Sequence, residues 1–383
     1  MLLLKIARGT ALAAAFAGLA YLAVARRCMR DFGRRTADET RDEPAITLFK
    51  PLCGAEPQLY ENLCTFCDQE YGDFEVIFGV AQANDPARAI AERVRDAFPS
   101  ARISIAIGGE ASAANPKVAN LLNMAAAARG EIFVIADSDM RVRRNYLRSI
   151  VTPFRDARAG AVTCLYRGRP ADGAASVLGA MYINSYFAPS VLVAAQLQGI
   201  AFGLGATIAV RRSALEAVGG FASLAAHLAD DYELGRLIQR SAASVELSRY
   251  VVENVVAEPS VNALVQHELR WARTIAAVRP IGYAFSGVTF PLSWALIYLV
   301  LGGNPGRGFT LAAAALVSRV ALQRIAHKAL DSGECPALWM VPVREALAFG
   351  IWAASFFGHD VAWRDRRFEQ DRQGRLLPKE RAH

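Results

Sequence analysis

Between residues 45 and 136 the chain alternates strand-like and helix-like segments. Short runs rich in Val, Ile and Phe are followed by longer segments whose apolar residues recur at helical spacing. The predicted strands are residues 45–50, 74–80, 101–107 and 132–136, and the predicted helices are residues 57–71, 86–98 and 117–129. This alternation predicts an α/β fold with a mainly parallel sheet and helices on both faces. Ligands bind such sheets beyond the carboxyl ends of the strands.

The chain is also apolar enough to place segments in lipid, because 53% of its 383 residues are hydrophobic and its mean hydropathy is +0.20. Residues 2–25 are apolar apart from Lys5 and Arg8, which would have to reach toward the interface. Five arginines follow, at positions 26, 27, 30, 34 and 35. The positive-inside rule therefore predicts a signal anchor whose C-terminal side faces the cytoplasm.

Three apolar segments after residue 279 are candidate membrane spans: residues 283–303, 308–325 and 338–357. Arg319 lies in the second, and Arg344 and Glu345 lie in the third, so these charges are expected to pair, to face protein or to lie near an interface.

Residues 174–197 are apolar too, but Pro189 interrupts them, which favours an interfacial or acceptor-lining helix. Further along, residues 203–211 are predicted as a turn and a strand, and residues 230–239 as a helix. The predicted organisation is a transmembrane anchor (1–25), a basic and polar linker (26–44), a cytoplasmic catalytic domain (45–279), a membrane region of two or three helices (280–363) and a basic cytoplasmic tail (364–383).

Charge and cysteine usage narrow the class of partner. The net charge is +7, and much of the basic excess lies beside the apolar segments, so it indicates contact with anionic lipid. No interleaved basic and aromatic platform is present, and we expect no nucleic-acid binding. Cys64 and Cys67 form a lone CxxC without nearby histidines, which favours a structural role in a reducing compartment.

Asp137 and Asp139 directly follow the apolar segment 132–136, with Ser138 between them. Two carboxylates at a strand end would repel a diphosphate unless a divalent cation joined them, and oxygen ligands suit Mg²⁺ or Mn²⁺. Such a cation would stabilise a departing nucleoside diphosphate as a Lewis acid. The alternative is a turn or a helix cap, which short Asp motifs often make.

Other acids follow the same logic. Asp85 lies in the loop that follows the strand-like segment 74–80. There it would accept hydrogen bonds from a uracil or ribose, or cap a helix that begins at Pro86. Asp230 and Asp231 precede an amphipathic segment, so they would either favour the positive end of its helix dipole or supply a general base for an alcohol.

Basic and aromatic candidates complete the set. Lys117, which opens a predicted helix, would offset phosphate charge or lie solvated at the surface. His267, Arg270 and Trp271 lie in a helical stretch, where Arg270 can pair with a diphosphate and Trp271 offers a flat face to a sugar or base. The alternative is an amphipathic helix on the membrane surface with Trp at the interface.

In order, these motifs resemble the ceramide glucosyltransferase family over nearly the whole chain. The resemblance rests on Phe49-Lys50-Pro51-Leu52-Cys53-Gly54, Asp85, Asn115-Pro116-Lys117-Val118, Asp137-Ser138-Asp139, Asp230-Asp231-Tyr232 and His267-Glu268-Leu269-Arg270-Trp271. It implies a GT-A fold in which Asp85 contacts the nucleotide, Asp137 lies at the metal and diphosphate, and Asp231 is the base. Arg270 and Trp271 would form the RW of a (Q/R)xxRW motif, with His267 where the family has Gln or Arg.

Within that family, three stretches are most similar to the bacterial branch of hopanoid biosynthesis: residues 136–142, 162–168 and 267–274. The resemblance implies transfer of N-acetylglucosamine from UDP-GlcNAc to bacteriohopanetetrol at a bacterial inner membrane. Transfer of glucose from UDP-glucose to ceramide is the alternative, since no derived feature separates the two lipids.

We expect one in-line displacement that inverts the anomeric carbon, with Asp231 deprotonating the lipid hydroxyl. A processive polysaccharide synthase shares these motifs but needs more membrane spans than the sequence offers. A non-catalytic sugar-nucleotide binder would have lost an acid, whereas Asp85, Asp137, Asp139 and Asp231 are all present.

Overall fold

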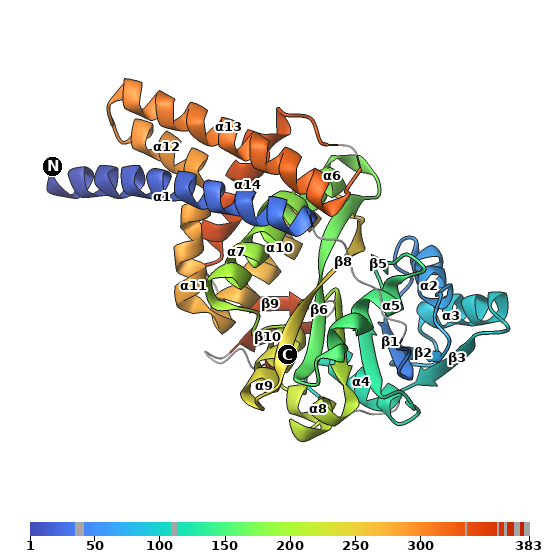
Figure 1. The fold of residues 1–383 in the computed structure, drawn as a ribbon. Helices are drawn as coiled ribbons and strands as arrows, with labels where there is room; N and C mark the ends of the chain where they lie inside the picture. The colour runs from blue at the N-terminus through green and yellow to red at the C-terminus, as the bar shows by residue number, and fades with distance from the viewer. Residues whose placement is uncertain are drawn as a thin grey trace. The chain divides into compact units, whose positions relative to one another are not determined.

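The computed structural model describes residues 1–34, 42–108, 113–333 and 335–357, and beyond them the backbone of 360–363, 366–370 and 376–378. The chain forms two compact units (Figure 1). What we call the sheet unit contains Thr36–Tyr166, Gly199–Val255 and Gly374–His383, and the helical unit contains Met1–Arg35, Arg167–Gln198 and Val256–Gln373.

This division differs from the predicted domain boundaries, which placed residues 45–279 in one domain. Residues 167–198 and 256–279 join the helical unit because their apolar side chains pack there. Leu178 and Met181, for example, share one buried cluster with Leu264, Met340 and Val341. The predicted tail, 364–383, lies outside the residues whose side chains are described.

The sheet unit is built on an eight-stranded sheet of order β3-β2-β1-β4-β7-β6-β8-β5. Its strands are β1 (Ile46–Leu52), β2 (Phe74–Val80), β3 (Arg102–Ile107), β4 (Ile132–Ala136), β5 (Met140–Arg141), β6 (Ala159–Pro170), β7 (Thr207–Arg211) and β8 (Ser244–Val256). The helices that follow its strands are α2 (Leu59–Cys67), α3 (Pro86–Ala97), α4 (Pro116–Ala125), α5 (Tyr146–Val151), α8 (Arg212–Ala217) and α9 (Asp230–Arg240). The predicted α/β class is therefore confirmed.

Half of this sheet is parallel. β1 pairs in parallel with β2 and β4, and β2 with β3, as the alternation of strands and helices predicts. Beyond β4 the pairs β4–β7, β7–β6 and β5–β8 are antiparallel, so the sheet as a whole is mixed. The sequence alternation ends at residue 136, and the later strands pair with the sheet through contacts that periodicity does not encode.

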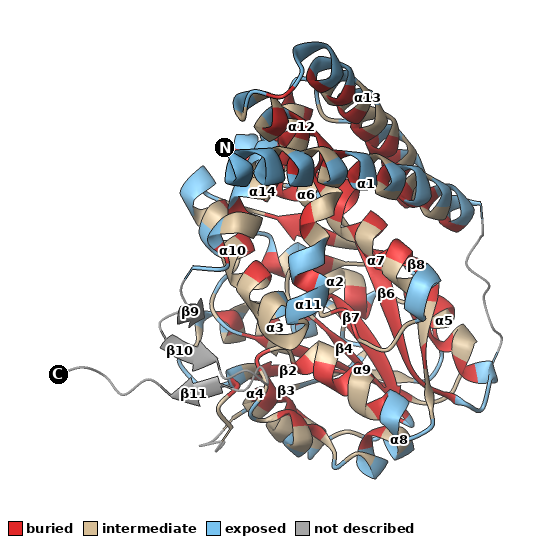
Figure 2. Cartoon of the chain, turned by 90° about the vertical axis from the view of Figure 1, so that its left-hand side faces the viewer, coloured by how far each residue is buried: buried red, intermediate tan, exposed pale blue. Residues whose placement is uncertain are grey.

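β1 extends past Pro51, where the predicted strand stopped. Pro51 pairs with Gly79 of β2, but pairing with β4 ends at Phe49, so the missing amide of Pro51 removes no bond on that side. Strands β1, β4, β6 and β7 are buried along most of their length, whereas the edge strand β3 has no buried residue (Figure 2). Their core is organised around the rings of Phe49, Phe133 and Phe221, which pack against each other at 5.2–6.3 Å between centroids.

The helical unit contains α1 (Leu2–Gly33), α6 (Gly173–Tyr182), a π-helical turn (Ile183–Phe187), α7 (Ala188–Gln198), α10 (Val261–Val278), α11 (Pro280–Phe285), α12 (Pro291–Val300), α13 (Pro305–Leu330) and α14 (Met340–Ala354). Short 3₁₀ turns cover Thr152–Arg155, Phe221–Leu224 and Ser286–Thr289 along the chain. Strands β9 (Asp360–Trp363) and β10 (Arg366–Gln370) pair antiparallel, and β11 covers Leu376–Pro378.

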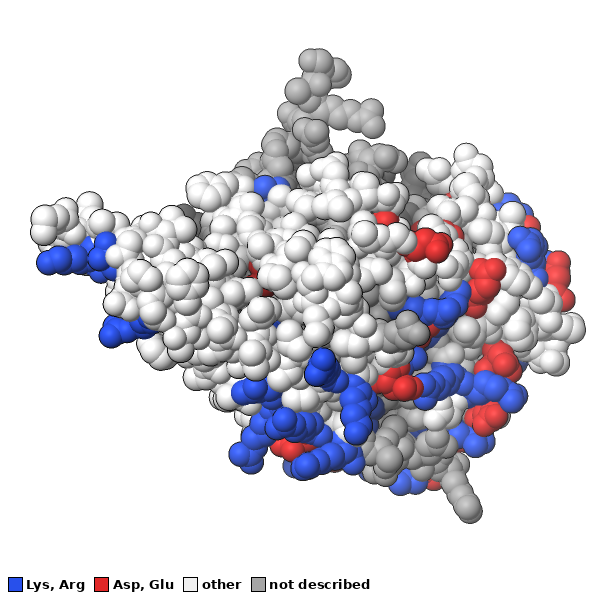
Figure 3. All heavy atoms as spheres, turned by 90° about the horizontal axis from the view of Figure 1, so that it is seen from above, with Lys and Arg blue, Asp and Glu red and all other residues white. Residues whose placement is uncertain are grey.

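Three helices in the described residues are long and apolar enough to cross a membrane: Leu2–Gly33, Gly173–Gln198 and Pro305–Leu330. The helix predicted to be an anchor continues beyond residue 25, because α1 runs unbroken through Arg26, Arg27 and Arg30. Figure 3 shows a broad region of the surface without acidic or basic side chains, next to a cluster of basic side chains.

The other two predicted spans are different from what the sequence indicated. Residues 283–303 do not form one helix, because Pro280–Thr289 and Pro291–Val300 meet at 74°. Pro291 disfavours a helical conformation at Phe290, whose φ of −112° and ψ of 61° lie outside the helical region. α14 has only 15 residues, fewer than the roughly 20 that cross a bilayer.

Residues 174–197, predicted as an interfacial or acceptor-lining helix, form a nearly continuous and mostly buried helix. The π-helical turn accommodates the interruption by Pro189, which has no amide hydrogen to donate.

Candidate active site

Two pairs of acids meet at one edge of the sheet. Asp137 and Asp139 directly follow β4, and Asp230 and Asp231 are the first residues of α9. A Cβ built on Gly205 would lie 3.1 Å from Asp231 Oδ2 and 3.6 Å from Asp137 Oδ2. The carboxylates of Asp137 and Asp231, which are distant in sequence, therefore face one point.

Glycines in the loop before β7 make this approach possible. A Cβ on Gly203 would lie 2.6 Å from the main-chain oxygen of Asp231, and a Cβ on Gly235 would lie 2.4 Å from the nitrogen of Gly203. Any larger residue at either position would have to displace backbone, so glycine allows this loop to pass over the first turns of α9. The loop thereby fixes where Asp231 lies.

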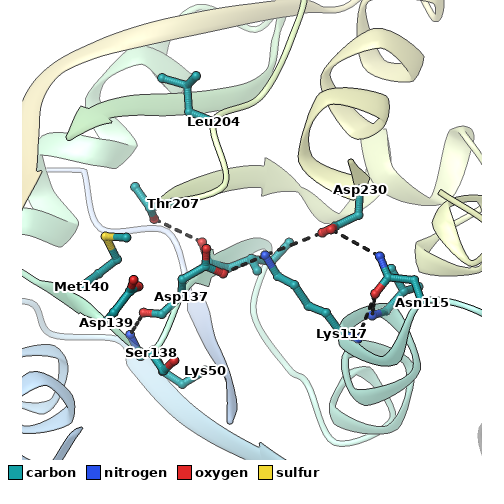
Figure 4. Close-up of polar contacts among 12 residues, drawn as sticks. Lys50, Asn115, Lys117, Asp137, Ser138, Asp139, Met140, Leu204, Thr207 and Asp230 are labelled. Carbon is teal, nitrogen blue, oxygen red and sulfur yellow. Dashed lines mark hydrogen bonds and ion pairs between the residues drawn. The ribbon is translucent and has the colours of Figure 1, made fainter. Parts of the chain in front are cut away.

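Lys117 lies between Asp137 and Asp230 (Figure 4). Its Nζ is 2.7 Å from Asp137 Oδ1 and 3.7 Å from Asp230 Oδ2. Asn115 caps α4 by accepting hydrogen bonds from the amides of Lys117 and Val118, at 2.9 and 3.2 Å. The amide of the Asn115 side chain donates to Asp230 Oδ1 at 3.4 Å, so one residue ties α4 to the acids.

Residues of β1, of the loop after it and of α2 form hydrogen bonds with the segment Asp137-Ser138-Asp139. Lys50 donates to the main-chain oxygen of Asp137 at 2.5 Å, and Ser138 donates to Glu56 at 2.5 Å. Asn62 donates to the main-chain oxygen of Ser138 at 3.2 Å. Burial lowers the pKa of Lys50 to about 7, although Asp137 favours its charged form.

Crowded carboxylates raise each other's pKa here. Burial, followed by the charge of Asp230, raises the pKa of Asp231 to about 7 in spite of Lys117. Burial and the charge of Asp137 raise the pKa of Asp139 to about 6. The pKa of Asp230 is also raised by burial, against the opposing charge of Lys117. The site therefore carries more negative charge than its ammonium groups compensate.

The donors present suit a divalent cation. Asp139 Oδ1 is buried and has no hydrogen-bond partner among the described residues, while Asp139 Oδ2 accepts from Asn254 at 2.8 Å. The described residues contain no group of three or more His, Cys, Asp or Glu side chains that could enclose a metal. Mg²⁺ commonly binds through one or two carboxylates plus phosphate oxygens, so Asp137 and Asp139 fit that role.

Asp85 caps α3, as the alternative interpretation predicted. Its Oδ1 accepts from the amide of Ala87 at 2.8 Å, and also from the amide of Gly54 at 2.8 Å. Asp85 thus joins the loops after β1 and β2 at the carboxyl edge of the sheet. A contact with a nucleotide stays a prediction.

His267, Arg270 and Trp271 lie on α10, in the helical unit, whereas the acids lie in the sheet unit. His267 Nδ1 is 2.6 Å from Glu258 Oε1, and its ring packs edge-on against Trp271 at 4.5 Å between centroids. The roles of these three residues toward a donor stay predictions.

Some participants were not assigned a role from sequence. Lys50 was visible as a single charge inside an apolar strand, which is a sign that a buried partner exists. Gly203 and Gly205 carried only the signal of two closely spaced glycines. Asn254 gave no signal, because it reaches Asp139 from β8 through a long-range contact.

Comparison with known proteins identifies the family. The sequence model of the family described as Glycosyl transferase family 21 matches residues 10–376. Ceramide glucosyltransferase 3 of Caenorhabditis elegans is 21% identical over 238 residues, which cover 62% of this chain and 52% of the relative. Ceramide glucosyltransferase 1 of the same organism is 24% identical over 238 residues, or 62% of this chain and 51% of the relative. The match spans about half the length of these relatives.

Among solved structures, the mannosyltransferase PcManGT from Pyrobaculum calidifontis, in complex with GDP-Man and Mn²⁺, superposes with a TM-score of 0.58. The superposition covers 92% of this chain and 99% of that chain at 19% identity. This similarity concerns the fold, and it confirms the predicted GT-A type.

Proposed function

Because this chain belongs to glycosyl transferase family 21, we propose that it transfers a sugar from a UDP-sugar to the hydroxyl of a membrane lipid, with inversion at the anomeric carbon. The observation that carries the proposal is the convergence of Asp137 and Asp231 on Gly205, with the ammonium of Lys117 beside Asp137. Sugar transfer from a nucleoside diphosphate requires a base for the acceptor hydroxyl and a cation for the leaving diphosphate. Asp231 is suited to the first task, and Asp137 is suited to binding the cation.

Asp231 acts as the general base. It takes the proton of the acceptor hydroxyl while the hydroxyl oxygen bonds to the anomeric carbon and the bond from that carbon to the diphosphate breaks. Its raised pKa, about 7, makes it a stronger base than an ordinary carboxylate and suits work near neutral pH. Asp230, next to it, helps to set that pKa through its charge.

Asp137 and Asp139 would hold a divalent cation, Mg²⁺ or Mn²⁺. Its chemical contribution when bound is to compensate the charge of the departing UDP. Lys50 and Glu56 keep the Asp137-Ser138-Asp139 segment in place from below. A site built on strand ends and packed lysine is rigid enough to keep both carboxylates oriented.

Asp85 would contact the nucleotide, and His267, Arg270 and Trp271 would contact the diphosphate and sugar. The contact with Glu258 supports a defined role for His267, because it fixes the orientation of the imidazole ring. Arg270 supplies a fork of donors suited to phosphate oxygens.

For the substrates we propose N-acetylglucosamine from UDP-GlcNAc and bacteriohopanetetrol, at a bacterial inner membrane with the sheet unit in the cytoplasm. The long apolar helices α1 and α13 support a membrane location. Glucosylation of ceramide is the second candidate, and it is favoured by the similarity to the two ceramide glucosyltransferases.

The test is a matrix of donors and acceptors on membranes that contain the full chain. UDP-GlcNAc and UDP-glucose are each combined with bacteriohopanetetrol and with ceramide, and lipid products are identified by mass. A GlcNAc-hopanoid alone supports the first candidate, and a glucosylceramide supports the second. Radioactive sugar in a polymer instead of a lipid would identify a polysaccharide synthase, and no product with any pair would refute both substrate assignments.

A further inference from the structure

The ammonium group of Lys117 contacts Asp137, one of the two carboxylates expected to bind a divalent cation. Its Nζ bonds Asp137 Oδ1 at 2.7 Å, and its side chain is only 16% exposed. The Asn115 cap holds the first turn of α4 in place, so the lysine reaches the acids from a fixed backbone.

The two acids suited to a metal are not equally available. Asp139 has an unpartnered buried oxygen, whereas one oxygen of Asp137 already binds Lys117. A divalent ion and an ammonium on the same carboxylate repel each other strongly at such distances in a partly desolvated site. Binding of the ion to Asp137 therefore competes with Lys117 for the negative charge of that carboxylate.

We propose that Lys117 is an exchangeable counter-ion: it neutralises Asp137 while the donor is absent, and releases Asp137 to a divalent cation when the diphosphate arrives to accept its ammonium. A lysine is suited to this exchange because it is a compact charge on a flexible stem that binds phosphate without fixed geometry. The inference rests on the proposed function and adds a coupling between cation and nucleotide. Each should bind weakly alone and more tightly in the presence of the other.

The direct test removes the ammonium. Mn²⁺ binding to the full chain in detergent is followed by the electron paramagnetic resonance signal of the free ion, with and without UDP. Lys117→Met should bind Mn²⁺ about tenfold more tightly than wild type without UDP, and should bind UDP about tenfold more weakly at saturating Mn²⁺. Lys117→Arg, which keeps the charge, should stay near wild type in the first measurement.

Lys50→Met is the matched control. Lys50 is also a lysine beside Asp137, but it contacts the main-chain oxygen and leaves the carboxylate untouched. A general effect of removing positive charge would tighten Mn²⁺ equally in Lys50→Met and Lys117→Met, and would overturn the inference. Unchanged or weaker Mn²⁺ binding in Lys117→Met would overturn it too, and Lys117→Gln provides a second neutral variant if the first does not fold.

The inference and the proposed function fail differently. If wild type binds no Mn²⁺ even with UDP, the divalent site itself is refuted. If wild type binds Mn²⁺ but the two affinities of Lys117→Met do not move in opposite directions, only the exchange is refuted.

Discussion

In the helical unit, buried carboxylates face arginines, whereas in the sheet unit carboxylates outnumber the lysines around them. Arg319 Nε lies 2.9 Å from Glu345 Oε2, and Arg344 binds Glu268 through two contacts of 2.6 and 3.0 Å. All four side chains are 5% exposed or less. The helical unit therefore pairs its buried charges within the chain, so that removal of one partner is costly. The sheet unit leaves negative charge around Asp139 uncompensated, as a cation site requires.

The helical unit also shows what buried charge does for a broken helix. Glu345 accepts the amides of Leu292 and Ser293 at 2.8 and 3.4 Å, and Arg319 donates to the carbonyl of Thr289. These backbone groups lie at the bend between α11 and α12 and have no helical partner there. The two members of the ion pair thus supply hydrogen bonds to the amides and the carbonyl of the bend.

The largest expected effect concerns the uncompensated acids. Asp231→Asn should lower the transfer rate about 10²–10⁴-fold, because it removes the proposed base. Product formation by mass spectrometry measures it, with Asp96→Asn, an exposed acid on α3, as the matched control. Full activity of Asp231→Asn would show that another group takes the proton.

The second prediction concerns the compensated pair. Glu345→Gln should destabilise the helical unit by about 3–5 kcal/mol, because it leaves the buried charge of Arg319 unpaired. Thermal unfolding in detergent measures the loss, and removal of both charges in Arg319→Met/Glu345→Leu should recover part of it. Equal stability of Glu345→Gln and wild type would contradict the comparison between the units.

The third prediction is a dependence of stability on pH that arises from the acids of the sheet unit. The pKa of Asp231 is raised to about 7 in the folded protein, so the folded state keeps a proton that the unfolded chain releases above about pH 4. Its contribution to stability is present below about pH 4 and is lost as the pH rises through about 7.

Chelator-treated wild type should therefore become less stable between about pH 4.5 and pH 8, and Asp231→Asn should have a shallower slope. Asp139, with its pKa raised to about 6, contributes with the same sign and leaves part of the slope in the variant. Identical slopes in both proteins would show that Asp231 titrates normally.

The smallest effect separates the two roles of Asp85. Asp85→Ala should cost about 1 kcal/mol through loss of the α3 cap, whereas Asp85→Ser should largely keep the cap. If Asp85 also contacts the nucleotide, Asp85→Ser should raise the KM for the donor at unchanged stability. An unchanged KM in Asp85→Ser would leave Asp85 as a cap alone.

Much of the sheet and its acidic edge was predictable, because local pattern encodes both. Segments 74–80 and 132–136 coincide with β2 and β4, and the acids after β4 follow from the rule that ligands bind at strand ends. The antiparallel half of the sheet was not predictable, since β7 joins β4 through pairing that spans some seventy residues of sequence. The same is true of Asn254, and of the glycines that bring Asp231 to Asp137.

In the membrane-candidate segments, hydropathy located apolar stretches but not their geometry. Pro291 fixes a bend within residues 283–303, although the average hydropathy of that stretch resembles that of a straight span. The prediction that the charges in α13 and α14 would pair is confirmed, since Arg319, Arg344 and Glu345 all form ion pairs inside the protein.

The chain leaves the sheet unit after Tyr166, forms the helix Gly173–Gln198, and re-enters the sheet unit at Gly199. If this helix crossed a bilayer once, β6 and β7 would lie in different compartments. They cannot, because they are hydrogen-bonded neighbours in one sheet. Of the three helices in the described residues that are long and apolar enough to cross a membrane, the connectivity of the chain therefore disfavours a crossing by this one and leaves α1 and α13 as the candidates.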